Sequence, residues 1–174
     1  MVKQDKQWGA LAIALATPFV AAAVGGVATS SSSATWYRRL RKPDWNPPGW
    51  IFGPVWNTLY LMMGFASWLV WRRRDDKQGW FGIGGKSQRV EVDGALRLYG
   101  IHLVFNALWS VIFFGLRRVD WALAELLVLW SLILTTLARF YEIDKRAGWL
   151  LVPYQLWATF ATVLNFTIWR MNRD

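Results

Sequence analysis

Residues 50–71 of the chain have the sequence WIFGPVWNTLYLMMGFASWLVW, and Arg72, Arg73 and Arg74 follow directly. The stretch contains no charged residue, and as a helix it is long enough to cross a hydrocarbon core of about 30 Å. A helix also satisfies its own backbone hydrogen bonds, for which lipid offers no partners. The stretch is therefore predicted to be a transmembrane helix that ends at the three arginines.

Working outward from this stretch, four more segments of the 174-residue chain have a similar length and apolar character. They are residues 8–28, 95–116, 121–140 and 149–169. Only Arg97, Glu125 and Arg139 carry charge within the five segments. We therefore predict a single all-α, multi-pass integral membrane domain, a bundle of five transmembrane helices. The sequence does not indicate which membrane holds it.

Composition excludes several other classes of protein. The chain has no cysteine, which removes disulfides, thiolate metal sites and cysteine nucleophiles, and its single histidine leaves no material for a histidine-rich metal site. The net charge of +9 sits between the apolar segments. We interpret these basic residues as determinants of membrane topology and as groups that attract lipid headgroups. No nucleic-acid partner is expected. Twelve basic residues on one side against eight on the other favour a cytoplasmic N-terminus.

The ends of the segments carry tryptophan, which favours the membrane–water boundary. These residues are Trp8, Trp50, Trp71, Trp121, Trp149 and Trp169. A cleaved signal peptide is the alternative interpretation of residues 8–28. The apolar run exceeds the ~7–15 residues of a signal sequence, and Pro18 within it is atypical, so retention is favoured.

The two longest connectors differ in character. Residues 30–33 are four serines, which predict a flexible opening to the connector 30–49. Residues 36–56 then hold four of the six prolines and four tryptophans, so this part is predicted to be a stiff lid or wall. The connector 72–93 is basic and glycine-rich, and we expect it to be the most mobile region.

Three of the predicted helices carry a face of polar, aromatic and small residues at helical spacing. The faces are Trp56, Tyr60, Gly64 and Ser67; His102, Asn106, Trp109 and Ser110; and Pro153, Trp157, Ala161 and Asn165. We predict that these faces meet in a cavity suited to a flat aromatic ligand, capped by the proline- and tryptophan-rich loop.

The same loop carries a recognisable motif. It consists of Trp36-Tyr37, Lys42-Pro43-x-Trp45-x-Pro47-Pro48-x-Trp50 and Pro54-x-Trp56, and later matching runs are Phe105-Asn106-x-x-Trp109-Ser110, Val152-Pro153-Tyr154-x-x-Trp157 and Ala161-Thr162-Val163-Leu164-Asn165. This pattern closely resembles the tryptophan-rich sensory protein and translocator protein family. The resemblance covers all five segments in order.

The resemblance implies a five-helix membrane protein that binds tetrapyrroles, notably protoporphyrin IX or haem, as well as sterols and benzodiazepine-like molecules. It implies a tetrapyrrole receptor or sensor in porphyrin homeostasis and stress response. The alternatives are a light- and oxygen-dependent porphyrin-degrading enzyme, in which Trp56 and Trp157 would react, and a porphyrin or sterol transporter. No obligatory cofactor and no metal site are expected. Members of the family commonly form homodimers, so the resemblance also implies a homodimer.

The expected ligand site combines the loop with the helix faces. It comprises Tyr37, Trp45, Pro47, Trp56, Tyr60, Asn106, Trp109, Ser110, Trp157 and Ala161. A segment similar to the sterol-recognition motif of eukaryotic members contains Leu164, Phe166 and Arg170, with phenylalanine in the place of the central tyrosine.

Some polar and small residues have simpler structural interpretations. His102 is expected to hydrogen-bond a neighbouring helix instead of ligating haem iron, and Asn165 likewise. Glu125 lies one turn beyond Asp120, so it can hydrate from the boundary, with a structural or proton-related role as the alternative. Small residues on the first segment are expected to pack within the molecule instead of forming an oligomer contact; they are Ala14, Pro18, Ala22, Gly25 and Gly26.

Overall fold

The computed structural model describes residues 2–28, 31–75 and 85–173, and every regular element within these ranges is helical. The elements are α1 (Val2–Ala28), α2 (Ser31–Arg39), α3 (Gly49–Arg72), the 3₁₀ helix η1 (Arg73–Asp75), α4 (Gly85–Ser110), the π-helix η2 (Val111–Gly115), α5 (Val119–Ile143) and α6 (Lys145–Met171). Five of the α-helices have 24 to 27 residues, and α2 has nine.

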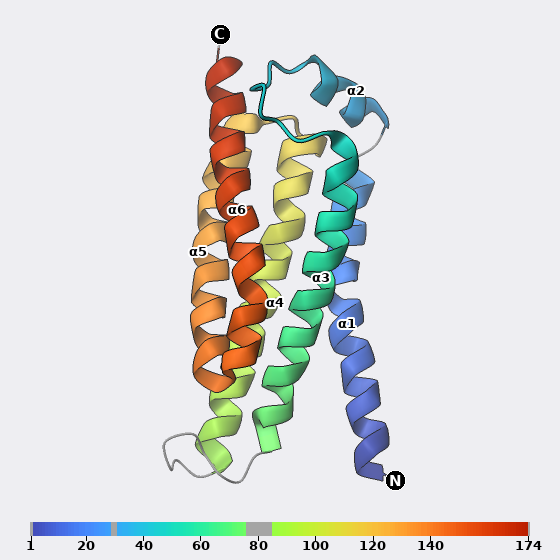
Figure 1. Ribbon diagram of the computed structural model, residues 1–174, viewed down its shortest axis with the longest axis vertical. Coiled ribbons are helices and arrows are strands. Elements are labelled where there is room, and N and C mark those ends of the chain that lie inside the picture. Colours follow the sequence, from blue (N-terminus) through green and yellow to red (C-terminus); the bar gives the residue numbers. More distant parts are fainter. Residues whose placement is uncertain (1, 29–30, 76–84, 174) are drawn as a thin grey trace.

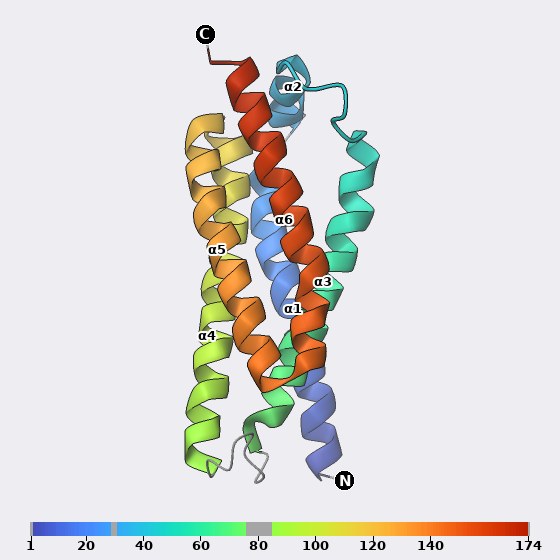
Figure 2. The same ribbon diagram turned by 60° about the vertical axis from the view of Figure 1, so that its left-hand side comes forward.

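The five long helices form a closed ring (Figures 1 and 2). In this ring α1 packs on α3, α3 on α6, α6 on α5, α5 on α4, and α4 on α1. The short helix α2 lies across one end of the bundle, the end at which α6 finishes, and the N-terminus lies at the opposite end (Figure 1).

Four of the helices are long and apolar enough to cross a membrane. Their spans are Gln7–Val27, Gln88–Gly115, Val119–Ile143 and Lys145–Met171. Helix α3, which contains the uncharged segment 50–71, is not among the four because its tryptophan, tyrosine, glycine, proline and asparagine residues lower its mean hydropathy. The protein is therefore an all-α integral membrane protein, as predicted, and four of its helices are candidate membrane spans by length and hydropathy.

The tryptophans predicted to mark the segment ends are largely exposed. Trp8, Trp50, Trp121 and Trp149 are 63–75% exposed, each near the end of a long helix. These are positions at which an indole can meet the lipid headgroups.

The connector predicted over residues 72–93 is shorter than expected. Residues 76–84 lie outside the described part of the chain, but residues 85–93 belong to α4. Charged and polar side chains stabilise this extension outside the apolar core. Asp93 forms an ion pair with Arg74, 2.9 Å apart, and the Gln88 side-chain amide donates to the backbone carbonyl of Arg73. A search for uncharged segments cannot detect such a polar helix end.

A second correction concerns the serines that open the connector 30–49. Residues 29–30 lie outside the described part of the chain, but Ser31–Arg39 is the helix α2, so the expected flexible stretch is wrong there. Tertiary packing explains the helix. The rings of Trp36 and Tyr37 pack edge-on against Phe113, with centroids 5.7 and 6.0 Å apart. At the C-terminal end of α2, the Lys42 ammonium donates to the carbonyl oxygens of Tyr37 and of Leu40, the residue after the helix.

The small residues of α1 allow close helix packing within the molecule, as predicted. A Cβ at Gly64 of α3 would lie 2.8 Å from the Ala14 carbonyl oxygen of α1. A Cβ at Gly25 of α1 would lie 3.0 Å from the Ser110 hydroxyl of α4. Helix α1 thus packs closely against α3 and α4 at glycines, which carry no side chain.

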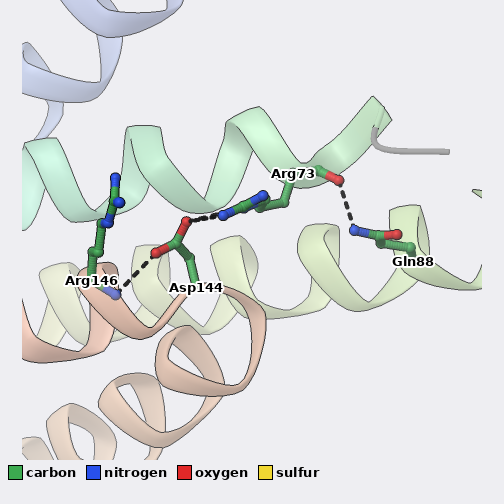
Figure 3. Close-up of polar contacts among 4 residues, drawn as sticks. All are labelled: Arg73, Gln88, Asp144 and Arg146. Atoms are coloured by element: carbon green, nitrogen blue, oxygen red, sulfur yellow. Dashed lines mark hydrogen bonds and ion pairs between the residues drawn. The ribbon is translucent and has the colours of Figure 1, made fainter. Parts of the chain in front are cut away.

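The end of the bundle opposite α2 is closed by a polar junction (Figure 3). Asp144 begins α6, and its carboxylate accepts from the backbone N–H of Arg146 at 2.9 Å. The other carboxylate oxygen accepts from two nitrogens of Arg73, at 3.0 and 2.8 Å. Because Gln88 bonds the Arg73 carbonyl, this junction joins the end of α3 to α4 and to the α5–α6 turn.

Candidate functional site

A cavity of about 550 Å³ is lined by residues of all five long helices and lies beside α2, which contributes two of them. That volume is within the ~300–1,000 Å³ typical of small-molecule sites. Twenty-four residues from the five long helices, α2 and η2 line it: Ala22, Gly25, Gly26, Tyr37, Arg38, Gly49, Phe52, Trp56, Tyr60, Asn106, Trp109, Ser110, Phe113, Phe114, Leu126, Leu129, Tyr154, Trp157, Ala158, Phe160, Ala161, Leu164, Asn165 and Ile168. Aromatic rings dominate this lining.

Most of the predicted site residues meet in this cavity. Those that line it are Tyr37, Trp56, Tyr60, Asn106, Trp109, Ser110, Trp157 and Ala161. Trp45 and Pro47 are not in the lining. Trp45 is 48% exposed and packs edge-on against Phe160, one of the lining residues. None of the residues 40–48 between α2 and α3 is in the lining, whereas α2 contributes Arg38 and the first residue of α3, Gly49, is part of it.

Three side chains from three helices form a hydrogen-bonded row at the cavity. The Tyr60 hydroxyl of α3 donates to the Asn106 amide oxygen of α4 at 3.2 Å, and the Asn106 amide nitrogen donates to the Tyr154 hydroxyl of α6 at 2.8 Å. Trp56 stacks on Tyr60, with ring centroids 5.3 Å apart and planes inclined by 26°. One asparagine therefore sets the relative positions of the two tyrosines and, through Tyr60, of Trp56.

Two further groups of rings build the walls. Trp157 of α6 packs against Phe52 of α3, with centroids 5.8 Å apart, and against Phe160 at 5.3 Å. On α4 and η2, Trp109 stacks on Phe113, with centroids 5.0 Å apart. The π-helical turn carries Phe113 and Phe114 into the lining, where both contact Tyr37 of α2. Single π-helical turns are frequent at functional sites.

Polar contacts hold the connector over this end of the bundle. Asn172, just after α6, pairs with the backbone of Arg41 in both directions: its amide oxygen accepts from the Arg41 N–H at 3.0 Å, and its amide nitrogen donates to the Arg41 carbonyl at 2.9 Å. The Tyr37 hydroxyl donates to the Asn46 side chain at 3.1 Å. Burial raises the pKa of Tyr37, the Asn46 hydrogen bond partly offsetting it, so Tyr37 stays neutral.

Replacing Asn172 by alanine should release the connector locally. The change removes two backbone hydrogen bonds, each worth about 0.5–1.5 kcal/mol, so the Arg41 amide should exchange its proton roughly 5- to 150-fold faster. Hydrogen exchange read by mass spectrometry measures this. The junction of Arg73 and Asp144 is the internal control, because the backbone amides there should keep the hydrogen-exchange rates of the unmodified protein. Unchanged exchange at Arg41 would show that the Asn172 pairing does not hold the connector.

His102 lies below the cavity and does not line it. Its ring is completely buried, and Nδ1 lies 3.2 Å from the Thr136 hydroxyl of α5. Because that hydroxyl donates to the Leu132 carbonyl, it accepts from Nδ1–H, which leaves Nε2 unprotonated in the neutral ring. The expected interhelical hydrogen bond is thus present.

The His102→Ala variant should retain protoporphyrin IX and haem binding. Since the ring does not line the cavity, we expect dissociation constants within about threefold of the unmodified protein, although the lost packing lowers the unfolding temperature. Binding is measured by tryptophan quenching on protein shown to be folded by circular dichroism. Loss of all porphyrin affinity in a folded His102→Ala variant would contradict the position of His102 outside the cavity lining.

Glu125 and Asn165 are both buried in the α5–α6 region. Glu125 is 7% exposed, and neither carboxylate oxygen has a hydrogen-bond partner among the described residues, so the expected hydration from the boundary is wrong. Packing of α5 against α6 excludes it from the surface. The Asn165 amide nitrogen donates to the Val119 carbonyl at 3.0 Å, the interhelical bond that was predicted.

The sterol-motif-like residues do not share one surface. Leu164 is buried and lines the cavity, whereas Phe166 is 45% exposed and Arg170 is exposed.

In the described part of the chain, no three histidine or acidic side chains lie close enough to hold a metal ion.

Several lining residues were missed by sequence reasoning. Tyr154 completes the hydrogen-bonded row. It stands in the matching run Val152-Pro153-Tyr154-x-x-Trp157, but Pro153, which is exposed, was assigned to the predicted face in its place. Helix α5 supplies Leu126 and Leu129, which resemble any other core leucines in sequence.

Comparison with known proteins assigns the chain to a family. The sequence model of the TspO/MBR family matches residues 14–170. The chain is 38% identical to the human translocator protein over 155 residues, 89% of this chain and 85% of that protein. It is 39% identical to the tryptophan-rich sensory protein of Cereibacter sphaeroides over 154 residues, 87% of each, and 36% identical to the tryptophan-rich protein TspO of Chlorobaculum tepidum over 168 residues, 97% and 99%. With a family match that extends over nearly the whole chain, this protein belongs to the TspO/MBR family.

Proposed function

We propose that the protein is a membrane receptor or sensor that binds a tetrapyrrole, protoporphyrin IX or haem, in the cavity beside α2. One observation carries the proposal: the cavity is walled by stacked and edge-on aromatic rings from several helices. Planar aromatic ligands gain stacking energy and apolar burial in such a site. The names of the relatives, which include a sensory protein, support the sensor role.

The proposal includes a fifth transmembrane helix, α3. This helix has 24 residues with no charge between Gly49 and Trp71, and it packs between α1 and α6, two of the candidate spans. Its position between these two helices supports a fifth crossing of the membrane. We also propose that α2 covers the cavity, since Tyr37 and Arg38 line it at that end.

A titration in the dark tests the binding proposal. Purified protein in neutral detergent is titrated with protoporphyrin IX while tryptophan fluorescence is followed. Trp56, Trp109 and Trp157 line the cavity, so we expect saturable quenching with one porphyrin per chain. Quenching that grows linearly with porphyrin, without saturation, would indicate partition into micelles and would rule out a receptor for this ligand.

A second function, light-dependent porphyrin degradation, is favoured by the two indoles of Trp56 and Trp157 in the lining. Excited porphyrin and oxygen can oxidise an indole, whereas phenylalanine is much harder to oxidise. Illumination of the complex in air distinguishes the two functions. Porphyrin absorbance that falls in the unmodified protein, but not in Trp56→Phe or Trp157→Phe, would support degradation, and equal loss in all three would contradict it.

A further inference from the structure

The cavity lining contains a single charged side chain, Arg38 of α2. Among the twenty-four lining residues the others are apolar, aromatic or neutral polar groups. Arg38 is also exposed, so it lies where the cavity reaches the surface of the protein. A guanidinium at the mouth of an aromatic cavity is placed to meet an anionic group of a ligand whose apolar body lies inside.

The position of Arg38 is fixed by the packing of its helix. Tyr37, its neighbour, packs edge-on against Phe113 and Phe114, with centroids 6.0 and 5.8 Å apart. The Lys42 ammonium binds the carbonyl oxygens of Tyr37 and Leu40, at 2.7 and 3.0 Å. Lys42 therefore neutralises the carbonyl end of α2, which would otherwise repel an anion near Arg38.

The charge of the surrounding segment has the same sign. Residues 36–50 contain four basic side chains, namely Arg38, Arg39, Arg41 and Lys42, against one acidic side chain, Asp44. The local potential at this end of the connector is therefore positive, and it attracts anionic ligands more strongly at low salt.

We infer that Arg38 is a specificity-determining residue that selects ligands with a carboxylate at the edge of a flat apolar body. The inference rests on the proposed function, because it assigns the acidic group of the same ligand to one side chain. Guanidinium groups bind carboxylates through two parallel N–H donors. A neutral ligand of the same shape would use the aromatic walls alone.

Two porphyrins that differ only in charge test this inference. Protoporphyrin IX carries two carboxylates, and its dimethyl ester carries none. The full chain in neutral detergent is titrated with both probes in the dark, as the unmodified protein and as Arg38→Gln, Arg38→Lys and Arg39→Gln. Arg39 is the matched control, because it is exposed on the same helix but does not line the cavity.

Arg38→Gln should weaken binding of the diacid by about 2- to 5-fold, as expected for an ion pair near the surface, and should leave binding of the ester unchanged. Arg38→Lys should retain part of the affinity for the diacid that Arg38→Gln loses. Arg39→Gln should change the affinity for either probe by no more than about twofold. High salt should weaken binding of the diacid less in Arg38→Gln than in the unmodified protein or in Arg39→Gln, because the ion pair with Arg38 is already absent.

Three results would overturn the inference in distinguishable ways. Equal effects of Arg38→Gln and Arg39→Gln on the diacid would mean that net charge, not Arg38, attracts it. An equal loss of affinity for the diacid and the ester in Arg38→Gln would mean that the Arg38 side chain contributes by packing against the ligand and not by its charge. Saturable binding of neither probe to the unmodified protein would refute the proposed function itself, and the inference with it.

Discussion

Replacing Trp56 or Trp157 by alanine should weaken protoporphyrin IX binding about 5- to 150-fold, which corresponds to roughly 1–3 kcal/mol. Each indole lines the cavity, and each packs on further rings, Trp56 on Tyr60 and Trp157 on Phe52. An aromatic contact contributes about 0.5–1.5 kcal/mol beyond the burial of apolar area. Phenylalanine at either position should keep most of the affinity because it keeps a stacking face. The measurement is quenching of the remaining tryptophans in the dark.

Trp169 provides the control for this pair. It lies on α6 like Trp157, but it is absent from the lining and packs against the Arg173 guanidinium, 4.9 Å from the ring centroid. Trp169→Ala should therefore bind protoporphyrin IX as the unmodified protein does. Equal affinities for Trp56→Ala, Trp157→Ala and the unmodified protein would place the ligand outside this cavity.

Replacing Asn106 by alanine is expected to lower the free energy of unfolding by about 1–4 kcal/mol, since two interhelical hydrogen bonds of about 0.6–2 kcal/mol each are lost. The reason is the row Tyr60–Asn106–Tyr154, in which both tyrosines are buried. Porphyrin binding should weaken as well, because Trp56 stacks on a tyrosine that is no longer held. Denaturation in detergent gives the stability, and the dark titration gives the affinity.

A double-mutant cycle with Tyr60→Phe sharpens this test. Tyr60→Phe alone removes only the 3.2 Å bond to Asn106, so it should cost less than half of the effect of Asn106→Ala. In the Asn106→Ala background the same change should cost almost nothing, because its partner is already absent. Additive losses would show that the two side chains do not act as one unit.

The fold was largely predictable because lipid imposes strong constraints on sequence. The segments 8–28, 50–71, 121–140 and 149–169 each lie within one long helix, since predominantly apolar runs of this length satisfy their backbone in lipid as helices. The polar beginning of α4 and the helix α2 escaped prediction. Both depend on contacts between distant residues, such as Arg74 with Asp93 and Trp36 with Phe113, that no local pattern encodes.

The candidate site was predictable where polar and aromatic residues recur at helical spacing. Trp56 and Tyr60 are one turn apart on α3, and Asn106 and Trp109 are one turn apart on α4, so their shared faces could be seen in the sequence. Phe113 and Phe114 could not be placed in this way, because the π-helical turn η2 changes the spacing and so the direction of their side chains.

The central claim is that the cavity beside α2 is the place where the tetrapyrrole binds, and filling the cavity tests it most directly. Ala161 of α6 lines the cavity, whereas Val163, two residues further along, is 52% exposed on the outside of the same helix. The measurement is the dark titration of folded Ala161→Trp and Val163→Trp with protoporphyrin IX. The account predicts no saturable binding to Ala161→Trp and unchanged binding to Val163→Trp; unchanged binding to a folded Ala161→Trp would contradict it.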